Sequence, residues 1–250
     1  MKNKISWYIR RSKEIIHEEG WREFLNKVLE QHGSIRTCLD EFITMVLAPL
    51  YIRGFYKVFA YSEVWTKTYW LGHPILKNPF DLWIYQEIIW ETRPDFIIET
   101  GTYMGGSALF FASIFDVIGS GKVITIDIRR YSMFSHPKII QIIGTSTSSE
   151  VVKRVENLVK GKKAMVILDS EHRKEHVLKE LRLYSSFVAK GCYLVVEDTG
   201  INGHPLNPGW GPGPYEAVRE FLLENNEFVA DREREKFFIN FPKAFLKSLK

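Results

Sequence analysis

Asp95 to Asp127 read DFIIETGTYMGGSALFFASIFDVIGSGKVITID, and this stretch decides the fold. A short apolar run, a cluster of glycines, a longer apolar segment and a second apolar run follow one another. This order predicts a buried strand, a tight turn, a helix and a second strand. An acid closes each strand, Glu99 and Asp127. The pattern is typical of the first unit of a doubly wound sheet, which binds a nucleotide across the carboxyl ends of its strands.

The glycines indicate which nucleotide suits this turn. Gly101, Gly105 and Gly106 let the backbone turn tightly and approach a ligand closely, and Ser107 is expected to cap the helix that follows. The spacing differs from the GxGxxG fingerprint, in which amides at a helix N-terminus hold a pyrophosphate. A carboxylate at Glu99 would repel a pyrophosphate. It favours a cationic or amino-bearing ligand such as the aminoacyl end of S-adenosylmethionine.

Asp127, at the end of the second strand, is placed to accept hydrogen bonds from ribose hydroxyls. The competing interpretation is an NAD site, because any doubly wound sheet has a glycine turn at this place. A third alternative is a non-catalytic binding protein on the same fold.

Composition narrows the class of protein. The chain has 250 residues, 45% hydrophobic and 26% charged, as expected for a globular protein with an ample core. Its net charge is +4, and the basic residues are interspersed with acidic ones and form no stripe. Nucleic acid is therefore not an expected partner. The two cysteines, Cys38 and Cys192, make no disulfide framework, and residues 1–30 lack the apolar core of a signal peptide. A cytoplasmic location is therefore expected.

The chain is expected to divide into a helical N-terminal extension, residues 1–65, and a catalytic domain, residues 66–250. Apolar residues recur three or four apart in the first part. Its segment 42–65 is unusually aromatic, and the longest apolar stretch in it, residues 42–51, is too short to span a bilayer. A helical lid, a homo-oligomer contact and a peripheral membrane contact all remain open for it.

Strands and helices alternate after residue 94, which predicts a parallel α/β sheet. The predicted strands are Val123–Asp127, Ile139–Ile143, Ala164–Asp169 and Tyr193–Glu197. The clearest helices are Ser149–Val159 and Glu175–Val188, and an amphipathic helix follows Pro214. Phe228–Ala230 and Phe237–Phe241 are expected to form a closing strand pair.

Acids also end the later strands. Asp169 follows one, and Glu197 with Asp198 follows another. Parallel strands end at one edge, so these side chains are expected to meet beside the nucleotide. Three close carboxylates repel one another unless a cation intervenes. An oxygen-only set suits a hard ion such as Mg²⁺. The alternative is that Asp169 caps the next helix and the Glu-Asp pair lies in a solvated turn.

His172, three residues beyond Asp169, is the expected general base for an acceptor hydroxyl. His204 is an alternative base, within the loop 200–214. This loop is rich in glycine and proline, carries Trp210 and is expected to form the acceptor-side wall. The only HxE pattern starts at His17 and lacks a second histidine, which disfavours an iron triad. The other charges are expected on solvated faces: Glu156, Glu171, Glu175 and the run Asp231–Lys236.

From about Trp70 onward the chain resembles the family of cephalosporin hydroxylases and rhamnosyl O-methyltransferases. The similarity lies in several motifs together: ETG from Glu99, GGS ending at Ser107, VILDSEH ending at His172, LVVED ending at Asp198, and EAVREFL from Glu216.

The resemblance implies a Rossmann-like class I methyltransferase sheet that uses S-adenosylmethionine and Mg²⁺. It implies metal ligands at Asp169, Glu197 and Asp198, a base at His172, and adenine contacts at residues 144–146. The predicted cofactor-binding residues are Glu99, Gly101, Thr102, Gly105, Ser107, Asp127, Ser146 and Asp169. The expected activity is metal-assisted methylation of a hydroxyl on a small-molecule or glycan acceptor, with a sugar as the preferred one.

Overall fold

The computed structural model describes residue 26 and residues 48–130, 135–236 and 243–250. Contacts divide the chain into residues 1–55 and residues 56–250. In the first unit the described residues include the start of helix α3 (Ala48–Tyr61). The HxE pattern at His17 and most of the predicted N-terminal helices lie outside the described residues. Among the described residues, no helix is long and apolar enough to cross a bilayer.

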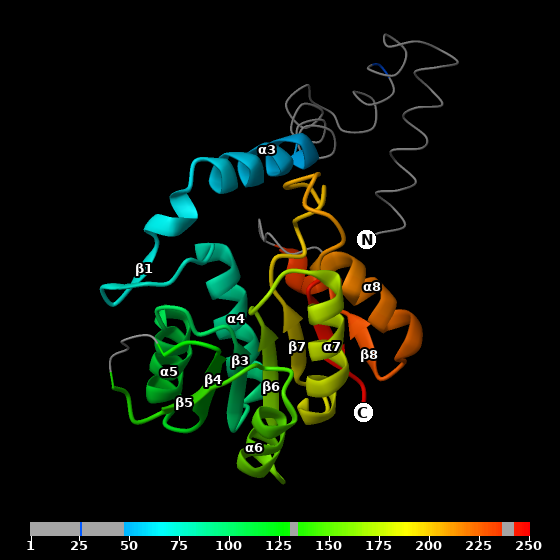
Figure 1. Cartoon of the computed structure of the whole chain (residues 1–250). Helices are drawn as coiled ribbons and strands as arrows, with labels where there is room; N and C mark the ends of the chain where they lie inside the picture. The colour runs from blue at the N-terminus through cyan, green and yellow to red at the C-terminus, as the bar shows by residue number, and fades with distance from the viewer. Residues whose placement is uncertain (1–25, 27–47, 131–134, 237–242) are drawn as a thin grey trace. The chain divides into compact units, whose positions relative to one another are not determined.

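The second unit is built on a seven-stranded sheet within the described residues, in the order β5-β4-β3-β6-β7-β9-β8 (Figure 1). Neighbouring strands are parallel from β5 to β7, and β9 runs antiparallel to both β7 and β8. The strands are β3 (Phe96–Thr100), β4 (Lys122–Asp127), β5 (Ile139–Ile143), β6 (Ala164–Leu168), β7 (Tyr193–Val196), β8 (Phe228–Ala230) and β9 (Phe245–Ser248). The strand order reverses between β3 and β6, which is where a doubly wound sheet binds its ligand.

Helices cover both faces of this sheet, and the strand residues alternate between two cores. Ile97 packs with α4 (Pro79–Thr92) and α5 (Gly106–Ile118). Its neighbour Ile98 belongs to the other core, which contains residues of three other helices: α6 (Ser149–Val159), α7 (Lys174–Tyr184) and α8 (Pro214–Glu224). Burial on both faces explains why the strands read as continuous apolar runs.

The smaller elements connect this frame. A two-stranded antiparallel sheet of β1 (Tyr69–Trp70) and β2 (His73–Pro74) precedes α4. The short 3-10 helices are η2 (Val64–Lys67), η3 (Ser185–Phe187) and η4 (Arg232–Lys236).

Two predictions about helix ends need correction. Ser107 does not cap α5: Gly105 is the N-cap, without a side-chain bond. The Ser107 hydroxyl instead interacts with the Glu99 carboxylate and opposes the rise in the pKa of that acid. The helix predicted to reach Val188 ends at Tyr184 and continues as η3, because residues from Ser185 tighten into 3-10 geometry.

The closing strand pair also differs. β8 is where the sequence predicts it, but its described partner is β9. The predicted segment Phe237–Phe241 lies outside the described residues. The sequences Phe237–Phe241 and Phe245–Ser248 are both short apolar runs. Periodicity alone cannot tell which of them pairs with β8.

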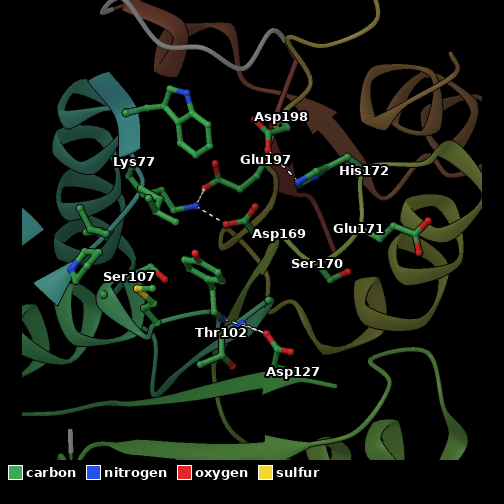
Figure 2. Close-up of a pocket in the computed structure, with 18 of the residues that line it drawn as sticks. Lys77, Thr102, Ser107, Asp127, Asp169, Ser170, Glu171, His172, Glu197 and Asp198 are labelled. Atoms are coloured by element: carbon green, nitrogen blue, oxygen red, sulfur yellow. Dashed lines mark hydrogen bonds and ion pairs between the residues drawn. The ribbon is translucent and has the colours of Figure 1, made fainter. Parts of the chain in front are cut away.

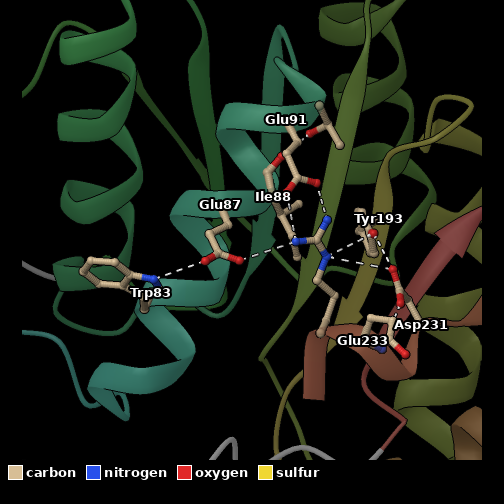
Figure 3. Close-up of polar contacts among 9 residues, drawn as sticks. Trp83, Glu87, Ile88, Glu91, Tyr193, Asp231 and Glu233 are labelled. Carbon is tan, nitrogen blue, oxygen red and sulfur yellow. Dashed lines mark hydrogen bonds and ion pairs between the residues drawn. The ribbon is translucent and has the colours of Figure 1, made fainter. Parts of the chain in front are cut away.

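The charge run Asp231–Lys236 is not merely a solvated face, because Arg234 ties η4 to α4. Figure 3 shows its partners Glu87 and Glu91 on α4, and Tyr193 and Asp231 on the other side. The Arg234 guanidinium is 12% exposed and pairs with the Glu91 carboxylate, with Glu87 at 3.6 Å. Its Nε donates to the Tyr193 hydroxyl at 3.3 Å. That hydroxyl in turn donates to Asp231 at 2.6 Å. This network fastens the antiparallel end of the sheet.

We expect Arg234→Met to lower the free energy of unfolding by about 1–3 kcal/mol, because it leaves several charged and hydroxyl groups without their donor. Urea denaturation followed by circular dichroism measures the change. The matched control is Arg232→Met, which removes an exposed pair with Glu235 at 2.9 Å. It should change stability by less than about 0.5 kcal/mol. Equal losses in the two variants would contradict the role of Arg234.

Candidate active site

One cavity of about 660 Å³ opens at the carboxyl edge of the sheet, among the residues the structure describes. Residues that follow β3, β4, β5, β6 and β7 line it, together with residues 74–78 before α4 and part of the loop after β7. Segments far apart in sequence therefore meet at the ends of parallel strands, as the predicted topology requires.

The glycine turn after β3 forms the floor of the cavity. Gly101 has φ of 91°, and a Cβ there would lie 2.0 Å from the Asp169 carbonyl oxygen. No side chain fits at this position. The amides of Thr102 and Tyr103 each donate to Asp127 Oδ2 at 3.0 Å (Figure 2). Asp127, at the end of β4, therefore fixes the shape of the turn as well as facing the cavity.

Glu99 lies beneath this turn and does not line the cavity. Its side chain is fully buried, and Oε2 accepts a hydrogen bond from Thr125 at 2.8 Å. Burial raises the pKa of Glu99 to about 7, although the Ser107 hydroxyl and the distant charge of Lys77 oppose the shift. Glu99, which the sequence predicts to bind the cofactor, therefore lies beneath the residues that line the cavity.

The acids after β6 and β7 meet around a lysine. Leu168 pairs with Val196 in the sheet, so the next residues, Asp169 and Glu197, leave it side by side. The Nζ of Lys77 lies 2.7 Å from Asp169 Oδ2 and 2.8 Å from Glu197 Oε1 (Figure 2). The Lys77 side chain is only 5% exposed. A buried ammonium thus compensates two carboxylates that would otherwise repel each other.

Tyr85 of α4 completes this arrangement by donating its hydroxyl to Glu197 Oε1. Burial raises the pKa of Glu197 to about 7, against the attraction of Lys77. Burial also works against the charge of Lys77, but Asp169 and Glu197 outweigh it and raise the lysine pKa above its usual value. Lys77 is therefore a cation here and not a proton acceptor.

A second group of ligand atoms lies next to the first. Oxygen or nitrogen atoms of Asp169, His172 and Asp198 all lie within 4.8 Å of one another. His172 Nε2 is 3.2 Å from Asp198 Oδ2. Asp198 adopts φ of 55°, in the left-handed region that non-glycine residues rarely occupy. Such backbone strain is often found at functional sites.

The sequence predicts that Asp169, Glu197 and Asp198 meet, with His172 beside them. The structure groups ligand atoms of Asp169, His172 and Asp198, and it pairs Glu197 with Lys77 instead. Sequence reasoning missed Lys77 and Tyr85. No motif marks Lys77, which stands between β2 and the N-cap of α4. Its role appears only when the β2–α4 connection is placed against the ends of β6 and β7.

The loop 200–214 supplies one wall of the cavity. Trp210 lines it, is 51% exposed and donates from Nε1 to the His172 carbonyl at 3.4 Å. His204 has a structural role: its Nε2 lies 2.9 Å from Glu216 Oε1, and its ring stacks on Tyr215. It does not line the cavity, whereas His172 does.

We expect Lys77→Met to lower the free energy of unfolding by about 3–5 kcal/mol, because the variant leaves buried carboxylates uncompensated. Urea denaturation measures the loss. Lys250→Met is the control, since Lys250 pairs with Glu227 at the surface at 2.9 Å. The control should unfold close to the parent protein. A Lys77 variant as stable as the control would show that the ammonium does not hold these acids.

Comparisons with known proteins agree with this fold. A structure titled cmcI-D160 Mg-SAM is 19% identical, with a TM-score of 0.58, over 74% of this chain and 78% of that one. An apo structure of CmcI gives the same TM-score and identity. The sheet order and this likeness define the class I fold of S-adenosylmethionine-dependent methyltransferases.

The sequence comparisons are more specific. The family model for rhamnosyl O-methyltransferase/CmcI matches residues 62–249. The rhamnosyl O-methyltransferase of Mycobacterium tuberculosis (strain H37Rv) is 40% identical over 203 residues, which is 77% of this chain and 82% of that protein. The one of Mycobacterium leprae is 40% identical over 221 residues, or 84% and 94%. The chain belongs to the rhamnosyl O-methyltransferase/CmcI family and is a methyltransferase.

Proposed function

We propose that the chain transfers a methyl group from S-adenosylmethionine to a sugar hydroxyl, with rhamnose as the first acceptor to test. The observation that carries this is the meeting of Asp169, His172 and Asp198 in one cavity with the glycine turn. The acceptor class rests on the names of the relatives that are 40% identical.

The cavity suits S-adenosylmethionine better than NAD. Carboxylates at Asp127, Asp169 and Asp198 line it. This chemistry attracts the positive sulfonium and ammonium groups and repels a pyrophosphate. S-Adenosylmethionine supplies an electrophilic methyl. Asp127 is placed for the ribose hydroxyls at the end of β4, and the acids after β6 and β7 are placed for the reacting end.

The same donor set fits a hard divalent ion, because it offers carboxylate oxygens within 4.8 Å of one another. Asp169 and Asp198 would hold the ion. Glu197 would be the third ligand if its carboxylate bound the metal in place of Lys77. A bound Mg²⁺ supplies positive charge that orients a hydroxyl and lowers its pKa.

The residues of the chain then account for proton transfer. His172 accepts the proton of the acceptor hydroxyl, whose oxygen forms the new bond to the methyl carbon while the bond from that carbon to sulfur breaks. S-Adenosylhomocysteine leaves as a neutral thioether. The Asp198 carboxylate at 3.2 Å stabilises the imidazolium that forms. Trp210 shields one side of the cavity and helps to align the two substrates.

The function is tested by calorimetry and by methyl transfer. We expect S-adenosylhomocysteine to bind and NAD not to bind, and a rhamnosyl glycoside to accept labelled methyl groups. His172→Ala should slow methyl transfer by at least about a hundredfold while cofactor binding persists, because it removes the proton acceptor. His204→Ala is the matched control and should retain activity. Binding of NAD in place of S-adenosylhomocysteine would contradict the proposal.

The metal site has a separate readout. Mn²⁺ titration followed by electron paramagnetic resonance should show one bound ion, and Asp198→Asn should weaken binding by about tenfold or more, because it removes a charged ligand. Asp95→Asn, at the opposite end of β3, should bind as the parent does. Unchanged binding in Asp198→Asn would remove this residue from the ligand set. Membrane contact and homo-oligomerisation by the aromatic segment 42–65 stay predictions.

A further inference from the structure

The acceptor meets a part of the cavity that the cofactor leaves free. The cofactor is proposed to lie over the glycine turn after β3 and over Asp127 at the end of β4. The loop 200–214 follows β7, at the other side of the acids in the strand order β5-β4-β3-β6-β7. An acceptor hydroxyl that reaches His172 therefore brings the rest of its sugar ring against this loop.

The surface that the loop presents to the cavity is largely apolar. Four residues of the loop line the cavity: Ile201, Leu206, Asn207 and Trp210. The side chains of Ile201 and Leu206 are almost fully buried in the protein, whereas Trp210 and Asn207 are exposed. The three apolar residues, Ile201, Leu206 and Trp210, are called the apolar wall below.

The apolar wall lies next to the residues of the proton-transfer step. The Ile201 amide donates to the Asp198 carbonyl at 3.2 Å. A Cβ on Gly213 would lie 3.2 Å from Ile201 Cγ1 and 3.3 Å from the His172 carbonyl oxygen, so both border the same small space. Figure 2 shows the side chains of His172 and Asp198 facing each other. A sugar bound at this pair therefore has its neighbouring atoms at the wall.

The wall has no hydrogen-bond donor left for a ligand. The only polar group in the Trp210 side chain is the indole N–H, which donates to the His172 carbonyl at 3.4 Å. The side chains of Ile201 and Leu206 have no polar group, and their backbone amides donate within the protein. A ligand hydroxyl pressed against this surface would lose its water and gain no partner.

Hydrogen bonds within the loop keep the wall from rearranging. The Gly203 amide donates to the Leu206 carbonyl at 2.6 Å. Glu216 of α8 ties both ends of the loop, because it accepts from Asn202 Nδ2 at 3.2 Å and from the Gly213 amide at 2.7 Å. A loop fixed in this way does not readily turn a backbone polar group toward the ligand.

We propose that Ile201, Leu206 and Trp210 are specificity-determining residues that receive the C6 methyl group of a 6-deoxy sugar and disfavour the same sugar with a hydroxyl on C6. The inference rests on the proposed function and deepens it, because it names the residues that select the acceptor. A methyl group buries apolar surface against the wall. A hydroxymethyl group would place an unsatisfied oxygen there.

The test compares methyl α-L-rhamnopyranoside with methyl α-L-mannopyranoside, which differ only by the hydroxyl on C6. With S-adenosylmethionine and Mg²⁺ present, kcat/KM of the parent protein should be at least about tenfold higher for the rhamnoside. In Leu206→Asn this ratio should fall to about threefold or less, because the amide can bond the extra hydroxyl. Leu223→Asn, at an exposed position of α8, is the matched control and should keep the parent ratio.

Calorimetry with S-adenosylhomocysteine identifies the variants that keep a folded cavity. Ile201→Thr is a second, smaller change that adds a hydroxyl to the wall and should lower the ratio in the same direction. A purely structural role would lower kcat/KM for both glycosides alike and preserve the ratio. Equal kcat/KM of the parent for both glycosides, or an unchanged ratio in a folded wall variant, overturns the proposal.

The two proposals fail differently. A parent protein that methylates neither glycoside contradicts the proposed function, together with the inference that rests on it. Methylation of both glycosides with equal kcat/KM agrees with the proposed function and contradicts the role of the apolar wall alone.

Discussion

The buried ammonium of Lys77 is the interaction on which the candidate site depends. The register of β6 and β7 delivers Asp169 and Glu197 side by side, whatever the surrounding side chains are. Two carboxylates this close repel strongly unless a cation lies between them. Lys77 approaches both within 2.8 Å and is almost fully enclosed. The acids can therefore stay together at the sheet edge without a metal, and a metal ion that bound these two acids would compete with an internal cation for them.

Because these strands are parallel, their order in the sheet sets the order of the chemical groups along its carboxyl edge. The acids follow β6 and β7, the glycine turn follows β3, Asp127 ends β4 and Ser146 follows β5. Along this edge the cavity changes from an acidic end, where Lys77 compensates two of the carboxylates, to an end lined by hydroxyl groups. This order of groups matches a ligand with a cationic part and a nucleoside part, and alignment of groups in advance is what a transfer reaction needs.

Several residues combine a structural role with a predicted functional one. Asp127 holds the amides of the glycine turn through Oδ2, and Asp198 keeps an uncommon backbone conformation while facing His172. Away from the cavity, Arg234 fastens η4 to α4, the helix that also supplies Tyr85 to Glu197. The rigidity of the site is in this way continuous with that of the sheet and its covering helices.

The sequence by itself determined the parallel sheet, several element boundaries and the acids at the strand ends. β5 (Ile139–Ile143) and α6 (Ser149–Val159) lie where the apolar pattern predicts them, because strand and helix periods are local properties. Only the tertiary structure decided that Lys77 lies between acids 92 and 120 residues away, that Glu99 is beneath the turn, and that His176 of α7 lies beside Ser146. Such contacts follow from the packing of distant segments against one another, and no local period or motif encodes them.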